Sequence, residues 1–233
     1  DAAQSIQLQR GLSAVNLATP SIGGTMNIIT NPAGAEKGGK FKQEGGAGNF
    51  LKTTFNYNTG LMMGDKLALS GTLVRKTGDG IIDATWTDAW AYYLGGSFQA
   101  NENNRFELYA IGAPQRHGQN LYKQNIATYS QELAGDVDGY DEGAYAEGAK
   151  FETEAGRTFN QNWGPVSSDY TGKQYWYMYG VGGMFGGGNQ PRYNSNFLNE
   201  RENFFHKPLV NLNHFMTIND KTRLSSVLYW SGG

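Results

Sequence analysis

The chain has 233 residues, of which 17% are charged, and a formal net charge of −2. This charge argues against nucleic-acid binding, which needs clustered Lys and Arg, and the lack of cysteine excludes disulfides, thiolate zinc sites and cysteine nucleophiles. No apolar run reaches the roughly 18 residues of a membrane-spanning helix, and no basic region followed by an apolar one marks a signal peptide.

The first segment, 8–33, reads LQRGLSAVNLATPSIGGTMNIITNPA. An Arg-Gly pair and a stretch of small residues lead to Gly23 and Gly24, and a short apolar run follows before Pro32. Glycine allows tight backbone bends, residues 13–17 can form a short helical turn, and the apolar run can pack inside a small globular unit. A strand-turn-strand unit of a soluble domain is the alternative at this point.

The residues that follow alternate between apolar and polar side chains. Phe55, Tyr57, Thr59 and Leu61 fall on one face of a predicted strand, because successive side chains of a strand point to opposite faces. The same alternation recurs along the chain. The predicted strands cover residues 40–47, 53–61, 67–73, 90–98, 105–110, 210–218 and 224–230.

Short and long connections between these strands alternate along the chain. The short ones are 63–66, 101–104 and 219–221, whereas 77–87 is longer and 120–205 is very long. Alternate connections of an up-and-down sheet lie at opposite ends, so this pattern favours an all-β fold, a transmembrane antiparallel β-barrel. A soluble sandwich also alternates and is the alternative. Five aromatic residues near strand ends fit an interfacial girdle: Trp90, Tyr92, Tyr93, Tyr229 and Trp230.

The long connection contains two groups of candidate binding residues. The first group is aromatic, and such side chains can stack on sugars or apolar ligands, or pack the loop against itself. Its members are Trp163, Tyr170, Tyr175, Trp176, Tyr177 and Tyr179. The second group is acidic: Asp136, Asp138 and Asp141 surround Gly139 in the manner of part of a calcium loop. A complete twelve-residue calcium frame is absent, so a solvated acidic loop is the alternative, and no other cofactor is expected.

Catalytic patterns are missing from the sequence. The three histidines, His117, His206 and His214, form no compact metal-ligand spacing, and no nucleophile-base order or phosphate-binding glycine loop is present. We therefore expect the protein not to be an enzyme.

The first thirty residues resemble the end of the plug domain of TonB-dependent outer-membrane receptors. Ile6 and Leu8 lie before the Arg-Gly pair, and the small residues, Gly-Gly and Asn-Ile-Ile-Thr follow in the family's order. The motif positions are Arg10, Gly11, Gly23, Gly24 and Asn27. The chain departs from the pattern at Gln7 and Gln9, where the family usually has an acidic residue, and at Leu12, where it has proline.

The resemblance implies a domain organisation. Residues 1–33 would be the end of the plug, and residues 34–233 would be about seven strands of a barrel of about 22, with an extracellular loop at 120–205. Seven strands cannot close such a barrel, so we expect part of a larger one, with residues 1–33 inside the curve of its sheet.

The resemblance also implies a function in the outer membrane of a Gram-negative bacterium. The receptor would take up a siderophore, cobalamin, haem, an oligosaccharide or a peptide, driven by TonB and its inner-membrane complex through a segment N-terminal to this chain. Further partners would be outer-membrane lipid, lipopolysaccharide, the small-molecule or oligomeric nutrient and a surface lipoprotein, but not nucleic acid. A non-transporting surface-binding or structural barrel that retains a plug is the alternative. A passive porin is a further one, against which the plug-like segment argues.

Overall fold

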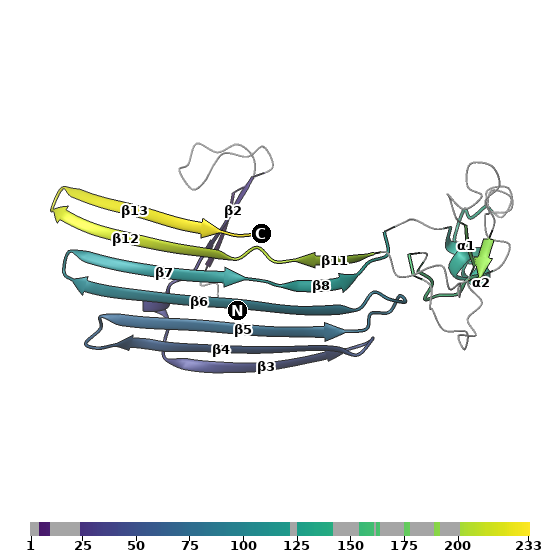
Figure 1. The fold of residues 1–233 in the computed structure, drawn as a ribbon, viewed down its shortest axis with the longest axis horizontal. Coiled ribbons are helices and arrows are strands. Elements are labelled where there is room, and N and C mark those ends of the chain that lie inside the picture. Colours follow the sequence, from purple (N-terminus) through teal and green to yellow (C-terminus); the bar gives the residue numbers. More distant parts are fainter. Residues whose placement is uncertain are drawn as a thin grey trace.

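The computed structural model describes residues 5–9, 24–121, 125–141, 154–160, 162–163, 175–177, 189–191 and 201–233. One antiparallel sheet dominates it, with seven long strands in the order β13-β12-β7-β6-β5-β4-β3 (Figure 1). These strands are β3 (Gly38–Gly46), β4 (Phe50–Met62), β5 (Leu67–Gly78), β6 (Thr87–Asn101), β7 (Asn104–Gly112), β12 (Leu209–Asn219) and β13 (Thr222–Ser231). Each of them coincides with one strand predicted from the alternation.

Shorter elements flank this sheet. β8 (Gln115–Gly118) pairs with β6 and with β11 (Glu202–Phe205), which makes the sheet nine-stranded. β1 (Ser5–Gln9) and β2 (Thr25–Ile29) form a separate antiparallel pair, followed by the 3-10 helix η1 (Pro32–Gly34). The remaining elements are α1 (Ile126–Tyr129), α2 (Gln131–Gly135), β9 (Tyr175–Tyr177) and β10 (Asn189–Pro191).

Helices contribute little to the fold. In the part of the chain that the structure describes, none is long and apolar enough to cross a membrane.

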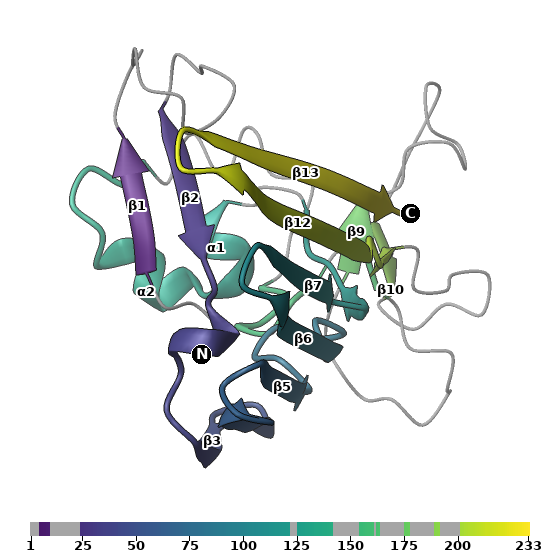
Figure 2. The same cartoon turned by 90° about the vertical axis from the view of Figure 1, so that its left-hand side faces the viewer.

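The sheet is an open arc with β3 and β13 at its two edges (Figure 2). Most consecutive long strands are also neighbours in the sheet, as expected for strands joined by tight hairpins. The right-handed twist of strands curves such a sheet, and β1, β2 and η1 lie on its concave side (Figure 2). The described residues thus do not close a barrel, as predicted.

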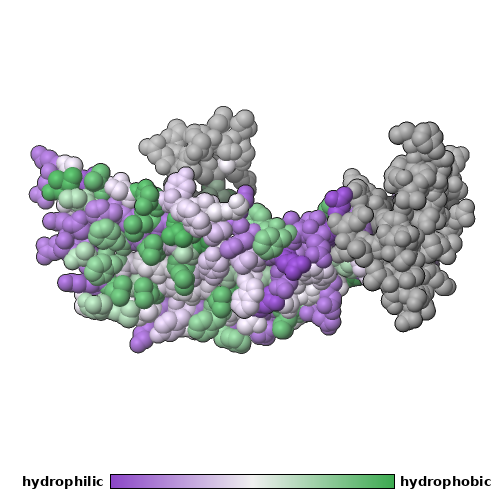
Figure 3. Space-filling view, viewed as in Figure 1, coloured by the Kyte–Doolittle hydropathy of each residue, from purple (hydrophilic) through white to green (hydrophobic). Residues whose placement is uncertain are grey.

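The two faces of the sheet differ in chemistry. The pairing register places Phe41, Phe55, Leu73 and Tyr92 in one row across β3 to β6 on the convex face. Figure 3 shows apolar residues spread over this face. The concave face is instead lined by small and polar residues, of which Thr54, Thr72 and Ser97 are buried. An apolar outer face and a polar inner face are typical of a transmembrane barrel.

The predicted faces are correct for most residues, but the girdle prediction is wrong for two tyrosines. Trp90, Tyr92 and Trp230 lie on the convex face by register. Tyr93 follows Tyr92 directly, so it points to the concave side, where only 7% of its surface is exposed. Tyr229 pairs with Asn211 and is on the concave face for the same reason.

A β-bulge also corrects the prediction for Leu61. The register shifts between Asn58 and Leu61, and Gly60 there has a φ of 64°. The extra residue reverses the alternation, so Leu61 pairs with Ala68 on the concave face instead of continuing the row of Phe55 and Tyr57.

The three predicted short turns lie at the end of the sheet opposite the two long connections, as predicted (Figure 1). The turn 47–49 between β3 and β4 is also short, but it lies at the end of the long connections, where Asp79 N donates to Gly48 O. The turns 63–66, 102–103 and 220–221 share one end. The connection 79–86, α1 and α2 lie at the other end. Which end faces the cell exterior stays a prediction.

Candidate functional site

Two stacked tyrosines on the inner wall of the sheet contact the segment that precedes β3. The rings of Tyr93 on β6 and Tyr109 on β7 have centroids 6.4 Å apart and an angle of 28° between their planes. Tyr109 Oη lies 3.0 Å from Glu107 Oε2 and 3.5 Å from the carbonyl oxygen of Thr30. Arg105 Nε in turn lies 3.2 Å from Glu107 Oε1. These contacts join the described end of residues 1–33 to the centre of the sheet.

Gly95 makes room for this contact. A Cβ at Gly95 would overlap Tyr93 Oη and would lie 3.1 Å from Pro32 Cγ. Pro32 is buried, and Asn31 caps η1 by accepting a hydrogen bond from Gly34 N at 3.1 Å. The sequence therefore provides a site without a side chain on the inner wall, against which the start of η1 packs. We call Thr30, Pro32, Tyr93, Gly95, Glu107 and Tyr109 the plug seat.

Polar side chains cross-link the inner wall beside the plug seat. Asn56 Nδ2 donates to Thr72 Oγ1 at 2.8 Å, and Ser70 Oγ donates to Asn58 Oδ1 at 2.7 Å. Such hydrogen bonds satisfy side chains on a wall that could not face lipid. This arrangement suits a water-filled interior.

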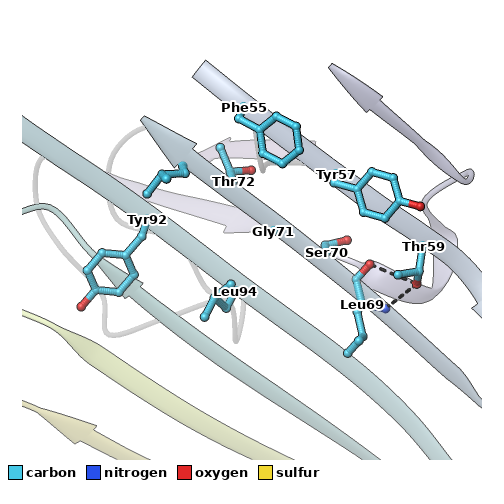
Figure 4. A pocket seen from close by; sticks show the side chains of 10 residues that line it. Phe55, Tyr57, Thr59, Leu69, Ser70, Gly71, Thr72, Tyr92 and Leu94 are labelled. Carbon is cyan, nitrogen blue, oxygen red and sulfur yellow. Dashed lines mark hydrogen bonds between the residues drawn. The ribbon is translucent and has the colours of Figure 1, made fainter. Parts of the chain in front are cut away.

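The convex side carries an apolar groove of about 520 Å³ (Figure 4). It lies over Gly71, which leaves a gap between Leu69, Leu73 and Leu94. Nearby, Thr59 Oγ1 accepts a hydrogen bond from Leu69 N at 2.9 Å, so its hydroxyl is satisfied within the protein. The apolar lining and the convex position distinguish this groove from a site for a polar nutrient.

Part of the long connection packs as a small unit beyond the sheet. Phe159 is 1% exposed and packs with Ala155 and Tyr129. The unit is fastened to the connection between β5 and β6, because Asp83 N donates to Thr158 O at 2.8 Å and Asn160 Nδ2 donates to Asp83 O at 2.8 Å. We call residues 125–141 and 154–160 the loop unit.

Two of the five predicted motif residues, Gly24 and Asn27, are among the described residues. Arg10, Gly11 and Gly23 lie outside the described residues. Gly24 has a φ of 110°, a conformation that favours glycine, and Asn27 in β2 pairs with Gln7 in β1.

Four of the six predicted aromatic binding residues of the loop are among the described residues. Tyr175, Trp176 and Tyr177 form β9, which pairs with β10, and Trp163 N donates to Asn160 O at 3.2 Å. Tyr170 and Tyr179 lie outside the described residues. Their role in binding stays a prediction.

The acidic group shows no compact cation site. Asp136 caps the C-terminus of α2, and Asp138 and Asp141 follow it. Among the described residues, no three His, Cys, Asp or Glu side chains come close enough together to hold a metal ion. Calcium binding by the loop stays a prediction.

The plug seat is not evident from the sequence alone. The alternation correctly places Arg105, Glu107 and Tyr109 on one face of β7. The signal that could have revealed the contact is Gly95, a glycine that the register puts beside Tyr109.

The fold is similar to that of known receptors, although the sequence is not. No family model matches the sequence, and no curated protein matches it. Among solved structures, the open form of the ferric-catecholate import receptor Fiu from E. coli K12 matches 99% of this chain and 28% of its own, with a TM-score of 0.61 and 14% identity. The ferripyoverdine receptor of the outer membrane of Pseudomonas aeruginosa matches 92% of this chain and 22% of its own, with a TM-score of 0.53 and 12% identity.

The chain has the fold of the TonB-dependent receptors. It spans about a quarter of the length of the receptors it matches. The TonB-dependent receptor fold explains why the plug seat lies on the concave face and why the apolar residues lie on the convex one.

Proposed function

We propose that this chain is the end of the plug and the first part of the barrel of an outer-membrane receptor that takes up a nutrient with energy from TonB. The observation that carries the proposal is the plug seat, where a segment resembling the plug end packs inside a sheet that is apolar outside and polar inside. The likeness in fold to import receptors supports it. In this reading residues 1–33 belong to the plug, residues 34–233 to the barrel, and 120–205 to the extracellular side.

The open edges of the sheet support a larger barrel. β3 and β13 each have one neighbour in the sheet among the described strands. Unpaired backbone groups in lipid cost several kcal/mol each. Further strands of the receptor, which we expect to number about 22 in total, would pair with both edges and enclose the plug.

The plug seat suggests how transport starts. Its polar contact with the plug end is from Tyr109 to Thr30 O, and Pro32 packs beside Gly95. We infer that this point holds the exit of the plug while the residues before it rearrange under the pull of TonB. The nutrient would then pass along the polar inner wall.

Uptake by cells that produce the complete receptor tests the proposal. We expect the receptor in the outer-membrane fraction, and labelled nutrient accumulation that is lost when TonB is absent. Nutrient binding without TonB-dependent accumulation would instead favour the non-transporting barrel. Accumulation that does not need TonB would favour a passive pore.

A further inference from the structure

Charge is unevenly divided between the two faces of the seven long strands. The chain as a whole has a net charge of −2, yet cations predominate on the concave face. The concave charged residues are Lys40, Lys42, Lys52, Lys76, Arg105 and Arg223 against Glu44 and Glu107. The convex face of these strands carries Arg75 and Asp88, which form an ion pair with each other. The inner wall is therefore strongly cationic in an overall acidic chain.

Four of these cations gather on three neighbouring strands. Lys52 on β4 pairs with Glu44 on β3 and with Lys76 on β5, so these three side chains form one row across the wall. On β3, Lys42 stands in the next inward-facing row and Lys40 in the row after that. Lys76 pairs also with the buried Ala89, which confirms that the row faces inward.

Glu44 is the one carboxylate that forms an ion pair with any of these four lysines among the described residues. Lys42 Nζ lies 2.8 Å from Glu44 Oε1, and Lys52 Nζ lies 3.1 Å from Glu44 Oε2. Within the described part of the chain, Lys40 and Lys76 form no ion pair. The lysine group thus keeps a net positive charge after its internal pairing.

Direct pairing of two lysines has an energetic cost. Like charges opposite each other on neighbouring strands destabilise a sheet. Lys52 and Lys76 are directly opposite each other in this way. A polar wall does not require lysine there, because neutral Asn, Ser or Thr would also be hydrated by a water-filled interior. A bound anion that reaches both ammonium groups would offset this repulsion.

The position of the group fits an entry route. Lys52 and Lys76 lie toward the end of the sheet that carries the connection 79–86 and the loop unit. A row of cations on the wall of a water-filled cavity with low-dielectric sides concentrates anions in it. Lysine ammonium groups bind phosphate and carboxylate oxygens as compact point charges.

We propose that Lys40, Lys42, Lys52 and Lys76 form an anion-binding wall, and that the nutrient carries a net negative charge on phosphate, carboxylate or catecholate oxygens. This inference rests on the proposed function, because it needs the concave face to line the route of the nutrient. It gives that route a charge preference that neither the fold nor the plug seat requires.

Two iron complexes of similar size test the charge preference. Ferric tris-catecholate is a trianion, whereas ferric tris-acetohydroxamate is neutral, and titration of the receptor's tryptophan fluorescence measures the binding of each. In the complete receptor we expect the trianion to bind more tightly, and the difference to shrink at high salt. Lys52→Gln with Lys76→Gln should weaken binding of the trianion by roughly fivefold per lysine, the scale of one charge contact in water.

A control and a second measurement keep the test decisive. Lys221→Gln, in the exposed turn at the opposite end, should leave binding unchanged. The single variant Lys76→Gln should be at least as stable to heat as the parent, because it removes the repulsion with Lys52 and breaks no ion pair of the described residues. Equal binding of the two complexes, no binding of the trianion, or an unchanged affinity in the double variant would overturn the anion-binding wall. Outer-membrane location and TonB-dependent uptake are measured independently, so failure of the proposed function would be visible on its own.

Discussion

Tyr109 and Thr30 are 79 residues apart in the sequence, and Tyr109 Oη lies 3.5 Å from the carbonyl oxygen of Thr30. This contact ties the segment before the sheet to the middle of its inner wall. The hydroxyl is also 3.0 Å from Glu107 Oε2, and the ring stacks on Tyr93. The tyrosine therefore connects the position of the plug end to the register of β6 and β7.

Tyr109→Phe removes the hydroxyl and keeps the ring. We expect the complete receptor to lose about 1 kcal/mol of stability, the usual worth of one such hydrogen bond. Protease cleavage near residues 30–35 should increase, because the plug end is held less firmly. Tyr57→Phe, on the convex face, is the matched control and should leave cleavage unchanged. Equal cleavage in both variants would show that the hydroxyl does not hold the plug end.

Gly95→Ala tests the packing part of the plug seat. The added Cβ would overlap Tyr93 Oη and approach Pro32, so a side chain or the segment must move. We expect a cost of about 1–3 kcal/mol in thermal or urea unfolding, as for overpacked sites. At Gly71 the nearest atom to an added Cβ is Leu94 Cδ2 at 3.7 Å, an ordinary contact, so Gly71→Ala should change stability by less than about 0.5 kcal/mol. Similar costs at the two glycines would contradict the seat.

The sequence predicts the strands well because a period of two is visible wherever one face is apolar. All seven long strands follow from that period, and the ends at which their turns lie follow from the up-and-down order of the strands. The bulge after Asn58 was not predictable, because a single inserted residue leaves apolar residues on both sides of it and only the pairing with β5 reveals it. The girdle prediction groups Tyr93 with Tyr92, although adjacent residues of a strand cannot share a face.

The plug seat depends on contacts that local patterns do not encode. Thr30 and Tyr109 meet only because the segment that leads into η1 folds back onto the sheet, where η1 contacts β4, β5 and β6. The charge division between the faces was in principle readable, since each charged strand residue has a definite parity. It becomes clear only when the register aligns Glu44, Lys52 and Lys76.

Leu212 and Asn211 on β12 test which face meets lipid. Leu212 lies on the convex face beside Leu108 and Leu228, and Asn211 lies on the concave face. We expect Leu212→Arg to destabilise the receptor in bilayers by about 2–4 kcal/mol, as for arginine on the lipid face of a barrel. Asn211→Arg should cost much less, since its side chain faces the interior. Equal costs in a lipid refolding titration would contradict the assignment of the faces.

Trp176 and Tyr177 test the role of β9. If these aromatic residues anchor the nutrient, replacement of each by alanine should weaken binding by about 1–3 kcal/mol. Binding of the labelled nutrient to intact cells gives the measurement. Surface labelling of the receptor checks that the variants reach the outer membrane in equal amounts. Unchanged affinity would assign the residues to packing of the loop.

Phe159 is the central buried side chain of the loop unit. Its replacement tests whether the loop unit unfolds independently of the sheet. The side chain is 1% exposed and fills the contact between Ala155 and Tyr129, so Phe159→Ala should cost about 3–5 kcal/mol locally. Hydrogen exchange should become faster for amides in 125–141 and 154–160, while β4 to β7 keep their protection, because the unit is joined to the sheet mainly through the connection 79–86. Leu133→Ala, at a side chain that is 40% exposed, is the control and should change exchange little. Faster exchange throughout the sheet would show instead that the loop unit and the sheet unfold as one.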